Sequence, residues 1–191
     1  MPKNIILCGV GGQGTILASK LIAAAAMAKD IKIQSAETIG MAQRGGSVFS
    51  HLRMGSGPHA PLIGRGKADL IIGFEPAETV RQLPFLKPDG AVVVRSRPVM
   101  PVSALIGDTG YPLEEILDYL RHHVQHLTMV DAEQAASDLG SAKVLNVVLL
   151  GAAARSGELG LGVDDLRQAV HQKMPEKVHA LNDRALNYTS R

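Results

Sequence analysis

The sequence predicts a three-layer α/β/α fold built on a mostly parallel sheet, and three observations lead there. Short apolar runs typical of strands buried on both faces alternate with longer segments that carry helical stripes of apolar residues. A glycine-rich turn joins the first strand to the first helix, as in parallel strand–turn–helix units. Several helical patterns follow one another near the C-terminal end. We therefore expect a single domain, residues 1–191, with extra C-terminal helices covering the sheet.

The first half of the chain supplies the clearest strand and helix. Residues 4–8 form a mostly apolar run that ends at a glycine, which predicts a buried strand. Leu17, Leu21, Ala24 and Ala28 recur at helical spacing and predict one apolar face of a helix. Beyond these, we expect a second strand at residues 32–36, a glycine-rich loop at 40–46 and an extended segment at 47–54.

In the second half, residues 68–74 read as another buried strand, and Pro76 favours the first turn of a short helix. A turn at residues 88–90 should lead into a strand at 91–94. Residues 98–112 hold three of the ten prolines, which indicates a surface excursion. The remaining expected elements are an amphipathic helix at 113–124, a strand at 127–130, a buried helix at 143–155, a helix from Val163 whose first turn holds Asp164 and Asp165, and a last helix at 176–188.

Composition excludes several classes of protein. The chain has 46% hydrophobic and 20% charged residues, as expected of a folded globular protein. Its formal net charge is +2 with scattered basic residues, so a nucleic-acid-binding surface is not expected. No apolar run approaches the roughly 20 residues that span a membrane, and no signal-peptide pattern opens the chain. We expect a cytoplasmic protein.

The segment Gly9-Val10-Gly11-Gly12-Gln13-Gly14 satisfies G-x-G-x-x-G between a strand and a helix, the context that makes the pattern informative for a Rossmann-like domain. Glycine permits close approach to the backbone, so free amides at the helix start can surround a phosphate or carboxylate. A tight turn packed against a neighbour is the alternative. A Walker P-loop is excluded because Ile16 follows Thr15, where that motif has Lys followed by Ser or Thr.

A second motif follows the second expected strand. Glu37 lies near the position at which dinucleotide-binding domains hold the ribose, so an NAD-dependent dehydrogenase stays open as an alternative. However, Gln43-Arg44-Gly45-Gly46 stands where such a domain would enter its second helix. Arg44 beside two glycines can present its guanidinium to a phosphate or carboxylate, although an exposed basic turn would have the same sequence.

Together, Gly9 to Gly14 and Glu37 to Ser47 make the chain resemble the gamma-type subunits of 2-oxoacid:ferredoxin oxidoreductases, and among them the beta subunits of indolepyruvate ferredoxin oxidoreductases. The resemblance extends through residues 68–76, 143–146 and 175–182, and so over nearly the whole chain. It implies a complex that oxidatively decarboxylates a 2-oxoacid, such as indolepyruvate or a related aryl pyruvate, to an acyl-coenzyme A and passes the electrons to ferredoxin.

The same resemblance implies how the cofactors are divided. Thiamine diphosphate, its Mg²⁺ and the iron–sulfur clusters are expected on a partner subunit, because this chain lacks Gly-Asp-Gly followed by Asn and has a single cysteine, Cys8. Coenzyme A is the ligand expected here. We place no catalytic residue and no metal ligand on this chain, and assign one anionic site to Gly11, Gly12, Gln13, Gly14, Gln43 and Arg44.

The sequence gives weaker evidence for a functional role of several other residues. Cys8 is expected to be a buried apolar residue. His122 and His126 share a helix face but lack a third metal ligand. Arg95 and Arg97 follow a strand end and either extend the anion site or lie on the surface or against a partner. The sequence also leaves open an assembly subunit with a vestigial glycine loop, a homodimer and the stoichiometry of the complex.

Overall fold

A six-stranded sheet runs through the centre of the computed structural model, which describes residues 2–37, 46–55, 60–98 and 110–189. The strand order is β2-β3-β1-β4-β5-β6. The strands are β1 (Lys3–Val10), β2 (Ile33–Glu37), β3 (Ser47–Met54), β4 (Ala68–Gly73), β5 (Leu86–Arg95) and β6 (His126–Val130).

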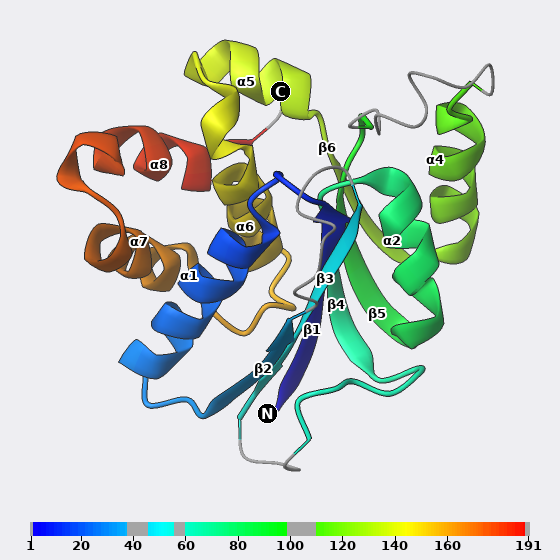
Figure 1. The fold of residues 1–191 in the computed structure, drawn as a ribbon, viewed down its shortest axis with the longest axis horizontal. Helices are drawn as coiled ribbons and strands as arrows, with labels where there is room; N and C mark the ends of the chain where they lie inside the picture. The colour runs from blue at the N-terminus through cyan, green and yellow to red at the C-terminus, as the bar shows by residue number, and fades with distance from the viewer. Residues whose placement is uncertain (1, 38–45, 56–59, 99–109, 190–191) are drawn as a thin grey trace.

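Helices cover both faces of this sheet, so the three-layer prediction is confirmed (Figure 1). On one side lie α2 (Pro76–Gln82) and α4 (Leu113–His123). On the other lie α1 (Thr15–Ala28), α5 (Ala132–Leu139), α6 (Leu145–Arg155), α7 (Val163–Lys173) and α8 (His179–Leu186). Short 3-10 turns are η2 (Leu83–Phe85), η3 (Ala142–Val144) and η4 (Glu176–Val178).

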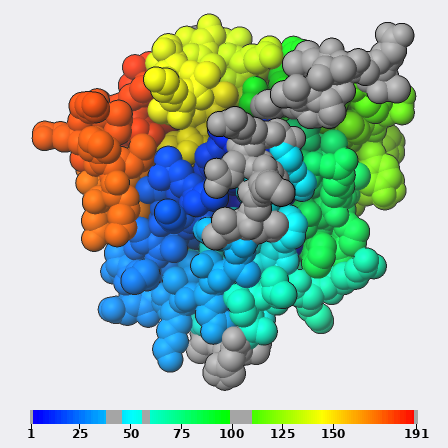
Figure 2. Space-filling model, in the orientation of Figure 1, coloured from blue at the N-terminus to red at the C-terminus, as the bar shows by residue number. Residues whose placement is uncertain are grey.

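Burial on both faces explains the apolar run of β1. Ile5 and Leu7 belong to the core beneath α1 and α6, whereas Ile6 and Cys8 belong to the core beneath α4. Both sets are fully buried because the side chains of a strand alternate between faces. The C-terminal helices form a further cover, since α7 packs on α1 and α8 on α6. Figure 2 shows the orange and red surface of these helices adjoining the blue surface of α1.

Strand β3 departs from a regular parallel sheet. It lies between β1 and β2 and runs antiparallel to both, while β1 pairs with β4, β4 with β5, and β5 with β6 in parallel. The prediction of a mostly parallel sheet is therefore confirmed, and the structure adds one inserted antiparallel strand. Consequently, β2 is one strand further from β1 than in a dinucleotide-binding domain.

The predicted turn at residues 88–90 is wrong, because these residues lie inside β5. The pairing there is irregular: Ala68 pairs with Leu86 and Leu70 with Ala91, so the extra residues of β5 form a bulge. A Cβ on Gly90 would lie 2.6 Å from Leu86 Cδ1 and 3.0 Å from the carbonyl oxygen of Ala68. Glycine is thus used for close packing within the strand.

Helix α5 was absent from the predicted elements. Asp131 caps its start by accepting hydrogen bonds from the amides of Glu133 and Gln134, at 3.1 and 3.0 Å. Gly140 ends it in the left-handed conformation, with φ of 73°. Most other expected elements are confirmed, including the first-turn position of Asp164 and Asp165 in α7. Of the excursion expected at 98–112, residues 99–109 lie outside the described residues. None of the described helices is both long and apolar enough to cross a membrane.

Candidate functional site: a glycine loop at the carboxyl edge of the sheet

The glycine loop lies at the carboxyl end of β1 and begins α1. Gly12 and Gly14 have φ of 99° and 80°, a region that non-glycine residues rarely adopt. Gly14 is also the N-cap of α1, and no side chain caps this helix end. The first amides of a helix have no acceptor within the helix, so this end is suited to an anion. The strand–turn–helix prediction is confirmed.

Hydrogen bonds within the chain decide which loop amides are available. The amide of Gly11 donates to the carbonyl oxygen of Gly46 at 2.9 Å, and that of Gln13 donates to the carbonyl oxygen of Val10 at 3.3 Å. The amides of Gly12 and Gly14 donate to no other backbone group among the described residues. Two of the four predicted amides are therefore engaged within the fold, and the other two have no backbone acceptor among the described residues.

A pocket of about 550 Å³ opens beside this loop. It collects the ends of three neighbouring parallel strands, because Arg95 ends β5, Phe74 follows β4 and the glycines follow β1. Ligands of open α/β sheets gather at this edge. The lining residues are Gly11, Gly12, Gln13, Gly14, Leu17, Phe74, Arg95, Ala142, Lys143, Leu145, Asn146 and Leu149.

Two cations, Arg95 and Lys143, lie on the pocket wall, and no carboxylate is found among its described lining residues. Arg95 is half-buried, and its Nε atom is buried without a hydrogen-bond partner among the described residues. Burial lowers the pKa of Arg95, and the carboxylates of Glu133 and Glu75 act in the opposite direction. The guanidinium still carries its charge at neutral pH. The pocket therefore combines two amides with two positive charges.

Arg95 and Arg97, which the sequence left undecided, have different positions. Arg95 lines the pocket, whereas Arg97 is exposed and its Nε lies 3.8 Å from Oε2 of Glu133. Lys143 and Asn146 were not predicted as site residues, although both fall in the segment 143–146 that carries part of the family resemblance. Asn146 is a buried polar side chain at the start of an apolar helix, a signal that could have identified it.

Of the segment Gln43-Arg44-Gly45-Gly46, the structure describes only Gly46. Gln43 and Arg44 lie outside the described residues, so their place in the site stays a prediction. Gly46 is described, and its carbonyl oxygen accepts the hydrogen bond from Gly11. The end of the segment Gln43-Arg44-Gly45-Gly46 therefore adjoins the glycine loop.

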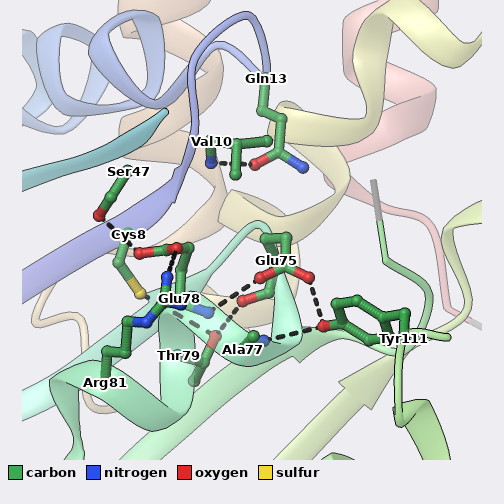
Figure 3. Close-up of polar contacts among 10 residues, drawn as sticks. All are labelled: Cys8, Val10, Gln13, Ser47, Glu75, Ala77, Glu78, Thr79, Arg81 and Tyr111. Carbon is green, nitrogen blue, oxygen red and sulfur yellow. Dashed lines mark hydrogen bonds and ion pairs between the residues drawn. The ribbon is translucent and has the colours of Figure 1, made fainter. Parts of the chain in front are cut away.

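Below the loop, Glu75 and Glu78 form a buried polar cluster at the junction of β4 and α2 (Figure 3). Oε1 of Glu75 accepts a hydrogen bond from the Tyr111 hydroxyl, and Oε2 accepts one from the amide of Glu78 at 2.9 Å. Oε2 of Glu78 accepts from the Ser47 hydroxyl at 2.6 Å. Burial raises the pKa of Glu75, and its hydrogen bond from Tyr111 opposes that rise.

Cys8 and Glu37 do not contribute to the pocket. Cys8 is fully buried, as expected, and burial raises the pKa of its thiol. Glu37 accepts a hydrogen bond from the Ser19 hydroxyl at 3.0 Å, and strand β3 separates β2 from β1. Glu37, on which the alternative of an NAD-dependent dehydrogenase rests, is therefore one strand away from the position at which dinucleotide-binding domains hold the ribose.

The histidines near the end of α4 are held by the helix itself. Nδ1 of His122 lies 2.7 Å from the carbonyl oxygen of Asp118, and Nδ1 of His123 lies 2.8 Å from that of Tyr119. The described part of the chain contains no group of three or more residues arranged to hold a metal ion.

Comparison with known proteins gives one consistent result. The family model described as pyruvate ferredoxin/flavodoxin oxidoreductase matches residues 4–190. The chain is 40% identical to an indolepyruvate oxidoreductase subunit IorB from Archaeoglobus fulgidus, over 97% of this chain and 92% of that protein.

Solved structures show the same fold. The gamma subunit of a keto/oxoacid ferredoxin oxidoreductase from Geobacter sulfurreducens has a TM-score of 0.69 at 22% identity, covering 97% of this chain and 94% of that one. A 2-oxoglutarate:ferredoxin oxidoreductase from Magnetococcus marinus, solved with 2-oxoglutarate, coenzyme A and succinyl-CoA bound, also has a TM-score of 0.69, at 21% identity. The match covers 97% of this chain but 30% of that longer chain.

Proposed function

Because the chain belongs to the pyruvate ferredoxin/flavodoxin oxidoreductase family, we propose that it is a non-autonomous subunit of a 2-oxoacid:ferredoxin oxidoreductase. The complex oxidatively decarboxylates a 2-oxoacid to an acyl-coenzyme A and passes the electrons to ferredoxin. The names of the relatives at 34–40% identity support indolepyruvate, or a related aryl pyruvate, as the substrate.

This chain contributes the coenzyme A site. The observation that carries this proposal is the pocket in which the amides of Gly12 and Gly14 lie together with Arg95 and Lys143. Coenzyme A bears a pyrophosphate and a ribose phosphate, which match two amides and two cations. The apolar side chains of Leu17, Phe74, Leu145 and Leu149 suit the less polar parts of the molecule. When bound, coenzyme A supplies the thiol that accepts the acyl group.

The redox groups belong to a partner subunit. A cubane or two-iron cluster needs several cysteine ligands, whereas this chain has one cysteine, which is buried. Thiamine diphosphate, Mg²⁺ and the clusters are accordingly placed on a thiamine- and cluster-binding partner, through which ferredoxin receives electrons. The residues of this chain bind and orient the anionic ligand and hold no reacting redox group.

The test uses the assembled complex and three alanine variants. Arg95→Ala and Lys143→Ala should each raise KM for coenzyme A about tenfold, because each removes one charge-assisted contact. KM for the 2-oxoacid should stay unchanged. Arg97→Ala is the matched control, since Arg97 follows the same strand but does not line the pocket. An unchanged KM for coenzyme A in both pocket variants would refute the site.

A titration with NADH separates the two ligand classes. We expect coenzyme A, and not NADH, to bind saturably to the complex and to bind more weakly after Arg95→Ala. Tight NADH binding that depends on Arg95 would favour the dehydrogenase alternative instead.

A further inference from the structure

We infer that Gln13 is a positioning residue, whose side chain fixes the shape of the glycine loop and thereby aims the Gly12 and Gly14 amides at the ligand. The inference rests on the proposed function of the pocket and assigns Gln13 a task different from ligand contact. Both polar atoms of its side-chain amide bond to the protein backbone, on two different strands' ends.

The first bond closes the loop on itself. Oε1 of Gln13 accepts a hydrogen bond from the amide of Val10 at 2.8 Å, as Figure 3 shows. The backbone amide of Gln13 in turn donates to the carbonyl oxygen of Val10 at 3.3 Å. Val10 and Gln13 therefore exchange two hydrogen bonds across Gly11 and Gly12, which fixes how tightly the chain turns there.

The second bond ties the loop to the neighbouring strand. Nε2 of Gln13 donates to the carbonyl oxygen of Phe74 at 2.9 Å. Phe74 follows β4, lines the same pocket and precedes Glu75 of the buried polar cluster. On the opposite side, the amide of Gly11 is held by the carbonyl oxygen of Gly46. The loop is thus braced against β4 and against the start of β3, and Gly12 and Gly14, which line the pocket, lie beside the two braces.

Gly9 supports this assignment, because it makes room for the Gln13 side chain. A Cβ on Gly9 would lie 2.4 Å from Oε1 of Gln13 and 2.8 Å from Cβ of Phe74. Real Cβ atoms do not approach other atoms so closely, so any larger residue would displace the glutamine. Gly9 therefore leaves room for the Gln13 side chain, whereas Gly12 and Gly14 allow the positive φ angles of the turn.

The brace predicts a distinctive result for two substitutions. Gln13→Ala removes both bonds and should raise KM for coenzyme A about tenfold while kcat at saturating coenzyme A is retained. Gln13→Glu keeps the acceptor for Val10 but places a second carboxylate oxygen against the carbonyl of Phe74. At pH 8 it should behave like Gln13→Ala. As the pH falls, protonation of this half-buried carboxyl restores a donor, and KM should return toward the wild-type value.

The experiment compares these variants with Gln168→Ala, an exposed glutamine on α7, and with Arg95→Ala, all in the assembled complex. KM for coenzyme A and for dephospho-coenzyme A, and hydrogen–deuterium exchange of residues 10–15, are measured for each. We expect both KM values to rise by the same factor in Gln13→Ala, together with faster exchange of the Val10 amide. Gln168→Ala should match the wild type.

Three outcomes would overturn the inference. An unchanged KM in Gln13→Ala, with a raised KM in Arg95→Ala, would show that the loop needs no brace. A raised KM with unchanged exchange at residues 10–15 would mean that Gln13 contacts the ligand directly. A raised KM in Gln13→Glu that does not recover at low pH would exclude the bond to Phe74. If Arg95→Ala also leaves KM unchanged, the proposed function itself fails.

Discussion

The side-chain nitrogen of Asn146 lies 2.8 Å from the position that a Cβ on Gly14 would occupy. This relationship joins the start of α6 to the N-cap of α1, two elements separated by most of the chain. It explains why the last position of the glycine motif admits no side chain. By contrast, nothing lies within 4 Å of a Cβ on Gly12, although Gly12 also has a positive φ.

Gly14→Ala and Gly12→Ala should therefore destabilise the protein to different extents. Each pays the strain of a left-handed residue, about 1–2 kcal/mol. Gly14→Ala must also displace the buried Asn146, which should add about 1–3 kcal/mol. Thermal unfolding of the two variants checks this, with Gly12→Ala as the internal control for strain. Equal losses would mean that Asn146 moves aside without cost.

Gly151→Ala tests the contact between α6 and α8. In an exposed helix this change would stabilise by up to about 1 kcal/mol. Here a Cβ would lie 2.1 Å from the carbonyl oxygen of Leu186 and 2.9 Å from its Cα, so backbone must shift. We expect a net loss of about 2 kcal/mol in the free energy of unfolding, measured by denaturant titration. A gain in stability would show that α8 can shift away from α6 at little cost in free energy.

Much of this fold could be predicted from sequence because its signals are local. The run at residues 4–8, the glycine loop and the helix after it are neighbours in the chain, so strand, turn and helix follow from adjacent residues. The insertion of β3 between β1 and β2 could not be predicted in this way. Strand direction and order depend on long-range pairing, which the extended pattern at 47–54 does not encode.

The residues of the candidate site also differ in whether local sequence could predict them. Gly12 and Gly14 were found because the motif is contiguous, whereas Arg95, Lys143 and Asn146 meet them only through the fold. Gln13 was named for its place in the motif, but its side chain is bonded to Val10 and Phe74. The turn expected at 88–90 failed because Pro, Asp and Gly favour a bulge as well as a turn.

His51 should make the protein sensitive to mild acid. It is 3% exposed, its Nδ1 accepts a hydrogen bond from the amide of Ile63 at 2.9 Å, and burial lowers its pKa. The folded state therefore keeps His51 neutral while the unfolded chain takes up a proton, so stability falls as the pH drops below about 6.5. His51→Leu should lose about 1–3 kcal/mol at pH 8, because the Ile63 amide is left unpaired.

The measurement for His51 is the free energy of unfolding of both proteins from pH 8 to pH 5. The difference between wild type and His51→Leu should shrink as the pH falls, since the variant has no such group to protonate. A difference that stays constant would contradict a lowered pKa for His51.

Glu75 should change the pH dependence of stability in the direction opposite to His51. Burial raises its pKa in the folded state, so the folded protein holds a proton that the unfolded chain has already released. Between the ordinary glutamate pKa and the raised value, the stability of the wild type should fall as the pH rises, and it should level off above that window. Glu75→Gln removes this dependence, so the stability difference between the two proteins should change with pH only inside the window.

Tyr111→Phe tests how the hydrogen bond from Tyr111 affects the pKa of Glu75. The hydrogen bond from the Tyr111 hydroxyl stabilises the Glu75 carboxylate and so opposes the rise in its pKa. Removing the hydroxyl should raise the pKa of Glu75 further and extend the window of falling stability to higher pH. Denaturant unfolding across a pH series measures both effects, and carboxyl chemical shifts of Glu75 report the pKa directly. A window that narrows in Tyr111→Phe would mean that the hydroxyl instead favours the protonated carboxyl.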